Sequence, residues 1–224
     1  MNAQPTLVFG ASTTAGLLAW HLEHDAGADI VGFALDADFQ RGSTYEERPV
    51  RTLQEWAEVM PPESVQVLVP TAYRWMNGLR IKKVEEARAL GFRIGTYVSS
   101  RALLPLGAPF QARPNTIIYE GCIVQAYAEV GENVILRAGA NIGHHSKVGD
   151  HSFIATGVTT GGAVTIGERC FVGIGAVIRD SVTLAPGTFV GAGAVVTRDT
   201  EPDGVYVGVP AKRREGVSAL EMTS

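Results

Sequence analysis

The sequence predicts a small α/β domain followed by an all-β solenoid, and two patterns support this prediction. Short apolar runs alternate with amphipathic stretches up to about residue 98, whereas residues 118–201 divide into fourteen consecutive blocks of six residues without an insertion. Alternating strands and helices are typical of a parallel sheet with helices on its faces, and a short fixed period is typical of stacked coils. We therefore place the first domain at residues 1–104 and the second at residues 105–224.

The first domain is expected to contain a small, Rossmann-like parallel sheet. Its predicted elements are a strand at 6–10, a helix at 12–24, a strand at 30–35, a helix at 53–60, a strand at 65–69, a helix at 77–90 and a strand at 93–98. Ligands of such sheets bind where the carboxyl ends of the strands meet. The loops after the first two strands are therefore the expected place for a substrate site.

The loop after the first strand, 10–16, is rich in small residues. Free N–H groups at the start of the following helix favour an anion such as a phosphate, although a tight turn capped by Ser12 or Thr13 accounts for the same residues equally well. After the second strand, Asp36 can accept hydrogen bonds from a ribose or a nucleobase, or it can be a solvated loop charge. The candidate substrate-binding residues are Gly10, Ser12, Thr13 and Asp36.

Each six-residue block begins with a residue that is expected to point into the core. Thirteen of the fourteen leading residues are branched aliphatics, Thr160 is the exception, and the fifth place always holds a small or β-branched residue. Burying one such aliphatic contributes about 1.5–3 kcal/mol, so the whole column outweighs local preferences. Three blocks per turn give about five coils of eighteen residues.

Composition argues against several classes of protein. The formal net charge is -4 and the basic residues form no stripe, which disfavours nucleic-acid binding. The sequence has neither an apolar run of eighteen residues nor a signal-peptide pattern, so we expect a cytoplasmic protein that does not enter a membrane. Cys122 and Cys170 both hold the small fifth place and are expected to be buried free thiols.

Three histidines lie close together at 144–151, and His144 holds the outward third place of its block. Gly162 follows eighteen residues later, at the same corner of the next coil. Acyl transfer from a thioester needs a base for the nucleophile's proton and a donor for the oxyanion. Histidine is the usual residue type for such a base, so His144 is the candidate, and Gly162 lets a thioester approach a backbone N–H. A surface histidine and a glycine that relieves a strained corner are the alternatives.

These blocks resemble those of the hexapeptide-repeat acyltransferases. With the domain ahead of them, the chain resembles the nucleotide-sugar acetyltransferases of the bacillosamine pathway and the related sialic-acid O-acetyltransferases. The resemblance implies a left-handed parallel β-helix with triangular coils, and a homotrimer with the site between subunits. It also implies that 10–16 and 32–36 bind the nucleotide of a nucleotide-linked sugar, that His144 is the general base, and that Gly162 contacts the acetyl thioester.

The chain departs from the pattern of that family at two places. The segment 12–14 reads Ser-Thr-Thr where relatives usually have a Gly-His-Gly type of turn, and His145 stands where they usually have Asp or Glu beside the base. A second histidine supplies no negative charge, so Asp150 or a carboxylate of a neighbouring subunit is the candidate to orient the base. Some relatives have a histidine near the acetyl group where this chain has Phe153, which leaves the role of His151 open.

The acyl donor that the resemblance implies is acetyl-CoA. Two stretches eighteen residues apart, 173–176 and 191–194, would stack as a track of small residues that accommodates a pantetheine arm, although corner geometry alone also explains their glycines. The basic segment 207–214 resembles the family's terminal Gly-x-Pro-Ala-Lys motif and can meet the donor's phosphates or simply cap the last coil. The candidate residues for binding acetyl-CoA are Gly162, Gly173, Ile174, Ala192, Lys212 and Arg213.

The sequence therefore predicts an acetyl-CoA-dependent acetyltransferase that acts on the amino group of a nucleotide-linked amino sugar by direct attack on the thioester, without a metal. Sugar O-acetylation is the close alternative, because the same base and donor serve a hydroxyl group. A zinc enzyme of the γ-carbonic-anhydrase type is less favoured, because it needs three histidines and none lies between residues 25 and 143. A non-catalytic, sugar-binding scaffold is the remaining alternative.

Overall fold

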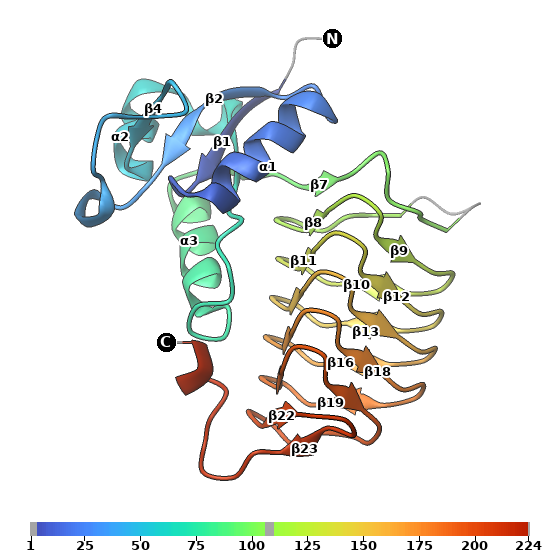
Figure 1. The fold of residues 1–224 in the computed structure, drawn as a ribbon. Coiled ribbons are helices and arrows are strands. Elements are labelled where there is room, and N and C mark those ends of the chain that lie inside the picture. The colour runs from blue at the N-terminus through green and yellow to red at the C-terminus, as the bar shows by residue number, and fades with distance from the viewer. Residues whose placement is uncertain (1–3, 106–109, 224) are drawn as a thin grey trace.

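The computed structural model describes residues 4–105 and 110–223, and it contains an N-terminal α/β part beside a tall solenoid (Figure 1). The strands of the first sheet are β1 (Pro5–Phe9), β2 (Asp29–Ala34), β3 (Thr44–Tyr45), β4 (Arg48–Arg51), β5 (Gln66–Leu68) and β6 (Arg93–Ile94). They lie in the order β3-β4-β2-β1-β5-β6 and are parallel except for the β3–β4 pair. The predicted small parallel sheet is thus confirmed, with a short antiparallel edge that the sequence pattern did not predict.

Three helices accompany this sheet: α1 (Thr13–His24), α2 (Leu53–Val59) and α3 (Gly78–Ala89). The Ser12 side chain accepts a hydrogen bond from the Ala15 N–H at the start of α1, so the predicted cap is Ser12 rather than Thr13. At the start of α2, Thr52 and Glu55 form a reciprocal capping box. Each helix therefore begins at or within one residue of its expected place.

The predicted strand at 93–98 is divided between the two parts of the molecule. β6 extends the first sheet, whereas β7 (Tyr97–Val98) pairs in parallel with β8 (Ile117–Ile118), which belongs to the solenoid. The Gly95 N–H still donates to Val67 of the first sheet, and the Tyr97 N–H already donates to Thr116. Solenoid hydrogen bonding therefore begins a few residues ahead of the predicted division at residue 104.

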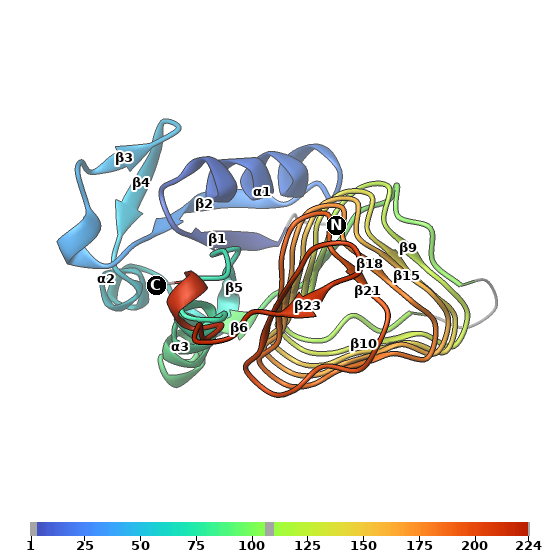
Figure 2. The same cartoon turned by 60° about the horizontal axis from the view of Figure 1, so that its bottom comes forward.

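The solenoid consists of three sheets, and the strands from β8 to β21 pair at intervals of eighteen residues. One sheet has the order β23-β22-β20-β17-β14-β11-β8-β7, the second β21-β18-β15-β12-β9 and the third β10-β13-β16-β19. Their bounds are β9 (Ile123–Val124), β10 (Glu129–Val130), β11 (Ile135–Leu136), β12 (Asn141–Ile142), β13 (Lys147–Val148), β14 (Phe153–Ile154), β15 (Thr159–Thr160), β16 (Thr165–Ile166), β17 (Phe171–Val172), β18 (Val177–Ile178), β19 (Thr183–Leu184), β20 (Phe189–Val190), β21 (Val195–Val196), β22 (Val205–Val207) and β23 (Lys212–Arg213). Viewed nearly along the stack, the coils superpose as a triangle (Figure 2).

The leading residues of the blocks fill the inside of this triangle. Ile118, Leu136, Ile154, Val172 and Val190, for example, are at most 1% exposed and stand above one another on one side. The two cysteines are also buried as free thiols, as predicted. Burial raises the pKa of Cys122 to about 11 and that of Cys170 to about 12, so both are protonated at neutral pH.

The sides of the triangle meet at three corners that recur in every coil. The first corner comprises 119–122, 137–140, 155–158, 173–176 and 191–194; the second comprises 125–128, 143–146, 161–164 and 179–182; the third comprises 131–134, 149–152, 167–170 and 185–188. The fourth residue of every block except the last has a positive φ, between 55° and 64° at the non-glycine residues Tyr127, Asn133, His145, His151, Ala163, Arg169 and Ser181. This left-handed position, which the aliphatic column did not reveal, turns the chain at each corner.

The N-terminal part is fixed to the third corner by a buried cation. Arg80 of α3 is 0% exposed and donates to the carbonyl oxygens of Asn133, His151 and Ser152. Burial lowers the pKa of Arg80 to about 9, so the guanidinium is still charged at neutral pH. Tyr73 adds an aromatic contact with Phe171, at 4.2 Å between ring centroids. These contacts hold the two parts in one arrangement.

None of the helices within the described ranges is long and apolar enough to cross a membrane.

Candidate active site

The second corner presents His144 and His145 side by side on the surface. Both side chains are exposed, and the His144 N–H donates to Oε1 of Gln125 in the preceding coil at 3.1 Å. One coil on, the Ala163 N–H donates to the His144 carbonyl at 2.8 Å. Backbone and side-chain bonds to both neighbouring coils therefore fix the position of His144.

Gly162 lies directly beneath the His144 imidazole, as the spacing predicts. A Cβ added at Gly162 would lie 2.3 Å from Cε1 and 2.5 Å from Nε2 of His144, which is far inside van der Waals contact. Within residues 4–105 and 110–223, no group accepts a hydrogen bond from the Gly162 N–H. The corner thus combines a basic ring nitrogen with a nearby unused backbone donor.

His145 supplies the hydrogen-bond partner of His144. The two Nδ1 atoms are 3.1 Å apart, and the His145 ring lies against Tyr127 of the preceding coil at 4.7 Å between centroids. Two neutral imidazoles can form this bond only if one Nδ1 carries the proton and the other accepts it. When His144 donates from Nδ1, its Nε2 lone pair is left free to accept a proton.

Thr160, the exception in the aliphatic column, changes the hydrogen-bond ladder at this corner. It is 4% exposed, and its hydroxyl accepts a hydrogen bond from the Gly143 N–H at 2.8 Å. At the equivalent place one coil on, the Gly161 N–H donates instead to the Ile178 carbonyl. The hydroxyl therefore replaces a backbone acceptor beside His144, and β12 and β15 pair only through Asn141 and Thr159.

Asp150 and His151 belong to the third corner and not to this site. Asp150 Oδ1 accepts a hydrogen bond from the Glu132 N–H at 2.7 Å, while His151 Nδ1 lies 3.0 Å from Nδ2 of Asn133. Burial lowers the pKa of His151. The expectation that Asp150 orients the base is therefore wrong for this chain taken alone, because Asp150 follows the histidine pair by one whole side of the triangle.

The zinc alternative requires three histidines, and His151 lies at a different corner from His144 and His145. In the part of the chain that the structure describes, no three His, Cys, Asp or Glu residues are grouped so that they could hold a metal ion.

The residues predicted to bind acetyl-CoA lie on different edges of one chain. Gly162 is at the second corner, whereas Gly173, Ile174 and Ala192 are at the first, where Ile174 is 63% exposed. A Cβ at Gly173 would lie 2.6 Å from the backbone nitrogen of Ala192, so the coils approach closely along this edge. The predicted basic residues Lys212 and Arg213 lie on β23 at the end of the solenoid, where Arg213 is paired with Glu201.

A cavity of about 620 Å³ lies at the carboxyl ends of β1 and β2, where the sequence predicts the substrate. Gly10, Ser12 and Asp36 line it, whereas Thr13 does not. Gly10 has a φ of +113°, which explains the glycine, and its N–H donates to the Ala34 carbonyl. The start of α1 is thus placed at the cavity.

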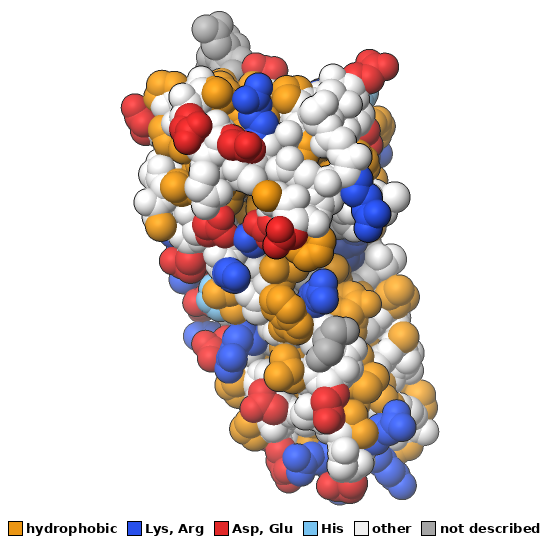
Figure 3. All heavy atoms as spheres, turned by 90° about the vertical axis from the view of Figure 1, so that its left-hand side faces the viewer, with side chains coloured by type: hydrophobic (Ala, Val, Ile, Leu, Met, Phe, Trp, Pro, Cys, Tyr) orange, Lys and Arg blue, Asp and Glu red, His pale blue; other side chains and the backbone are white. Residues whose placement is uncertain are grey.

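The cavity contains charged residues that the sequence analysis did not predict, and its predicted carboxylate is paired. Asp36 is paired with Lys83 of α3, so its carboxylate is not simply available to a ligand. Arg74, Trp75 and Lys82 also line the cavity, and all three are exposed. Basic, acidic and apolar side chains mix on this side of the molecule (Figure 3). These residues could not be predicted from the sequence pattern, because α3, which carries Lys82, and the turn before it, which carries Arg74 and Trp75, reach the cavity only when α3 packs on the sheet.

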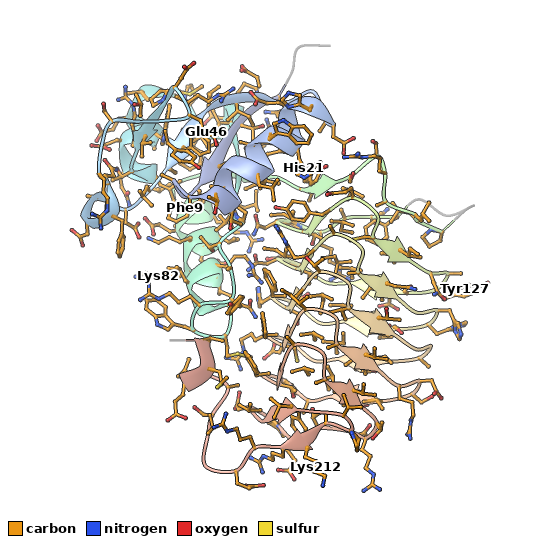
Figure 4. The ribbon with its side chains drawn as sticks, in the orientation of Figure 1. Phe9, His21, Glu46, Lys82, Tyr127 and Lys212 are labelled. Atoms are coloured by element: carbon orange, nitrogen blue, oxygen red, sulfur yellow. The ribbon has the colours of Figure 1, made fainter. Side chains whose placement is uncertain are left out.

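The cavity and the histidine pair lie on opposite sides of one chain. Figure 4 shows Phe9 and Lys82, both of which line the cavity, on the side of the N-terminal part, and Tyr127 at the far edge of the solenoid. His145 lies against that tyrosine. A single chain therefore does not bring the two sets of residues together.

A comparison with protein families agrees with the hexapeptide repeats that the sequence predicts. Residues 127–162 and 163–198 match the family model of the bacterial transferase hexapeptide (six repeats). No curated protein matches the chain in sequence.

Three solved structures share the whole fold. A histidine-to-asparagine mutant of perosamine N-acetyltransferase from Caulobacter crescentus, in complex with CoA and GDP-perosamine, is 25% identical, with a TM-score of 0.82 over 94% of this chain and 96% of that chain. The acetyltransferase domain of PglB from Neisseria gonorrhoeae is also 25% identical, with a TM-score of 0.82 over 94% of this chain and 100% of that chain. WeeI from Acinetobacter baumannii is 20% identical, with a TM-score of 0.73 over 93% and 99%, and shows the fold alone. The predicted left-handed β-helix and the resemblance to nucleotide-sugar acetyltransferases are thus confirmed.

Proposed function

We propose that this chain, which is built of bacterial transferase hexapeptide repeats and has the fold of the nucleotide-sugar acetyltransferases, transfers the acetyl group of acetyl-CoA to the amino group of a nucleotide-linked amino sugar. The observation that carries the proposal is the exposed His144 imidazole stacked on Gly162, whose N–H is unused. The similar perosamine N-acetyltransferase has been solved with CoA and GDP-perosamine, and the PglB domain has also been solved with acetyl coenzyme A.

The reaction follows from these two groups. The neutral amine attacks the thioester carbonyl carbon, and His144 Nε2 takes the proton that the nitrogen loses as the C–N bond forms. The Gly162 N–H donates to the oxygen that becomes negatively charged in the tetrahedral intermediate. The C–S bond then breaks, and the CoA sulfur leaves with the electron pair and receives the proton that His144 took, which gives the acetamido sugar and free CoA and returns His144 to its starting state.

The hydrogen bond between His144 and His145 directs this chemistry to one nitrogen. With the shared proton on Nδ1 of His144, only Nε2 can act as the base, and Nε2 is the nitrogen that lies 2.5 Å from the Cβ position at Gly162. The contact with Tyr127 holds the His145 ring in turn. In this chain the His145 imidazole takes the place that Asp or Glu usually takes in relatives.

The cavity of the N-terminal part suits the nucleotide. Arg74 and Lys82 are exposed cations at its wall, close to the start of α1, and this combination favours a diphosphate. Trp75 is 44% exposed and offers a flat apolar surface to a nucleobase. A volume of about 620 Å³ is typical of a small-molecule site.

Because the cavity and His144 face away from each other in one chain, we place the complete site between neighbouring copies in a homotrimer. One copy would hold the nucleotide, and the second corner of its neighbour would supply the base. The pantetheine arm would lie between that corner and the first corner of the adjacent copy, along Gly173, Ile174 and Ala192. Lys212 and Arg213 at the end of the solenoid would then be available to the phosphates of acetyl-CoA.

The decisive experiment measures thiol release from acetyl-CoA with a panel of nucleotide-linked sugars. Each sugar nucleotide is supplied in a 4-amino, a 3-amino and a hydroxyl form. We expect release with an amino sugar and an acetamido product in the mass spectrum. Release only with hydroxyl forms would show O-acetylation instead, and release with no acceptor would overturn the proposal.

A second experiment tests the shared site. His144→Ala removes the base, and the double variant Arg74→Glu/Lys82→Glu impairs the cavity, so each protein alone should be nearly inactive. Co-expression of the two should restore part of the activity, because some interfaces then pair an intact cavity with an intact base. No recovery from isolated mixed oligomers would contradict the arrangement, and a monomer in light scattering would exclude it.

A further inference from the structure

One wall of the nucleotide cavity is formed by a turn with an unusual backbone, Tyr73–Asn77, which we call the cavity turn. Arg74 and Trp75 line the cavity directly. Trp75, Met76 and Asn77 have φ values of 54°, 47° and 67°, so three consecutive non-glycine residues are left-handed. Each such residue costs about 1 kcal/mol or more and persists only where its surroundings enforce it.

Part of that enforcement comes from a segment far along the chain. The Trp75 N–H donates to the Thr223 carbonyl at 2.9 Å, and the Met76 N–H donates to the Thr223 hydroxyl at 2.8 Å. Thr223 is only 5% exposed. Thr223 therefore accepts hydrogen bonds from the backbone amides of both Trp75 and Met76, although it lies 147 positions after Met76 in the sequence.

The segment that carries Thr223 is ordered by its own sequence. The Ser218 N–H donates to the Glu221 carboxylate at 2.8 Å, and the Glu221 N–H donates back to the Ser218 hydroxyl at 3.3 Å, which is a capping box. Ala219 is 0% exposed, and its N–H donates to Asp203 of the last coil. We call residues 218–223 the docking segment. It runs from the end of the solenoid to the base of α3 (Figures 1 and 2).

The cavity turn is held from its other side by the solenoid. Asn77 Nδ2 donates to the Cys170 carbonyl at 3.2 Å, and the Tyr73 ring packs on Phe171. No residue of the docking segment lines the cavity. The turn that this segment holds therefore gives it an indirect route to a ligand in the cavity.

We propose that the docking segment positions the nucleotide wall, with Thr223 as its positioning residue. The inference rests on the proposed function, since it concerns the same cavity. Without the two bonds to Thr223, the Trp75 and Met76 amides lose their partners, and the turn relaxes toward a right-handed backbone that moves Arg74 and Trp75. The second corner lies on the far side of the solenoid and is unaffected, so the effect is on nucleotide binding and not on the acetyl-transfer step.

The test compares Thr223→Val, which keeps the shape and removes the hydroxyl, with Thr223→Ser, which keeps the hydroxyl. Calorimetry measures the Kd of UDP, GDP and dTDP, and the nucleotide that wild type binds most tightly is the probe. Losing a buried hydrogen-bond partner of an amide predicts at least a fivefold increase in Kd for Thr223→Val, with Thr223→Ser close to wild type. The KM for acetyl-CoA and kcat at saturating substrate should not change.

Two further measurements keep the test independent of how well that variant folds. Glu221→Ala breaks the capping box without changing the cavity turn itself, and it should weaken nucleotide binding in the same way. Glu215→Ala, which removes another exposed carboxylate outside the docking segment, is the control and should not weaken binding. Hydrogen exchange should show faster exchange in the peptide 73–79 for Thr223→Val and Glu221→Ala. A wild type that binds no nucleotide would overturn the proposed function and this inference with it. Binding that is unchanged in both variants would overturn this inference alone.

Discussion

Replacing Gly162 with alanine tests the geometry of the proposed base directly. The new Cβ would lie 2.3 Å from His144 Cε1, whereas ordinary contact begins at 3.4 Å, so the imidazole must move by about 1 Å. A misplacement of that size costs about 100-fold in rate. Because Gly162 does not have a positive φ, alanine fits the backbone there and the fold should keep its stability.

We therefore expect Gly162→Ala to lower kcat/KM for the amino sugar by about 100-fold, or about 2.7 kcal/mol, in the thiol-release assay. Thermal unfolding should be unchanged. Gly42→Ala is the control, because a Cβ at Gly42 would meet no atom within 4 Å and its backbone is not left-handed.

The double variant Gly162→Ala/His144→Ala tests whether the two residues act as one unit. The three atoms nearest to the added Cβ all belong to His144, so removing that ring removes the clash. The double variant should lose little more activity than His144→Ala alone, since both changes disable one group. Losses that multiply, or a Gly162→Ala enzyme with wild-type kcat, would show that this contact does not position the base.

Three further outcomes follow from the structure. His145→Ala removes the partner 3.1 Å from His144 Nδ1 and should lower kcat about tenfold, with KM for both substrates unchanged in steady-state kinetics. Gly157→Ala, at a φ of 69° and with no atom within 4 Å of the new Cβ, should lower the free energy of unfolding in urea by about 1 kcal/mol. The hydrogen bond from the Ser100 hydroxyl holds the pKa of Asp25 well below its usual range. This bond therefore stabilises the folded protein at pH values above the ordinary carboxyl pKa, and the stabilisation is lost in acid as Asp25 becomes protonated. Ser100→Ala should therefore cost about 1 kcal/mol at pH 7, and urea titrations should show that this difference shrinks below about pH 4.

The six-residue period allowed the proximity of His144 and Gly162 to be predicted, because a repeat without insertions converts sequence spacing into position. His144 and Gly162 share the third place of blocks one coil apart, and the structure stacks them. The same period did not reveal which side chain is the hydrogen-bond partner of the His144 imidazole. Asp150 is near in sequence, but it lies at the next corner, and the actual partner is the adjacent His145.

The cavity residues were predicted less completely, because their chemistry is assembled from several segments. Gly10, Ser12 and Asp36 follow strands whose ends could be read from the sequence, and they do line the cavity. Arg74 and Lys82 belong to a turn and a helix whose placement depends on how α3 packs. Asp36 is neutralised by Lys83, a pairing that spans 47 residues and has no local signal.

By itself, the sequence determined the solenoid, its register, the N-terminal sheet and the proximity of His144 to Gly162. Each of these depends on local periodicity and on the burial of apolar side chains, which the residue pattern records directly. Only the tertiary structure decided that Arg80 would be buried as a cation between the two parts and that Thr223 would hold the cavity turn. Polar contacts of that kind join segments far apart in the chain, and the hydrogen bonds that satisfy them exist only once both surfaces have formed.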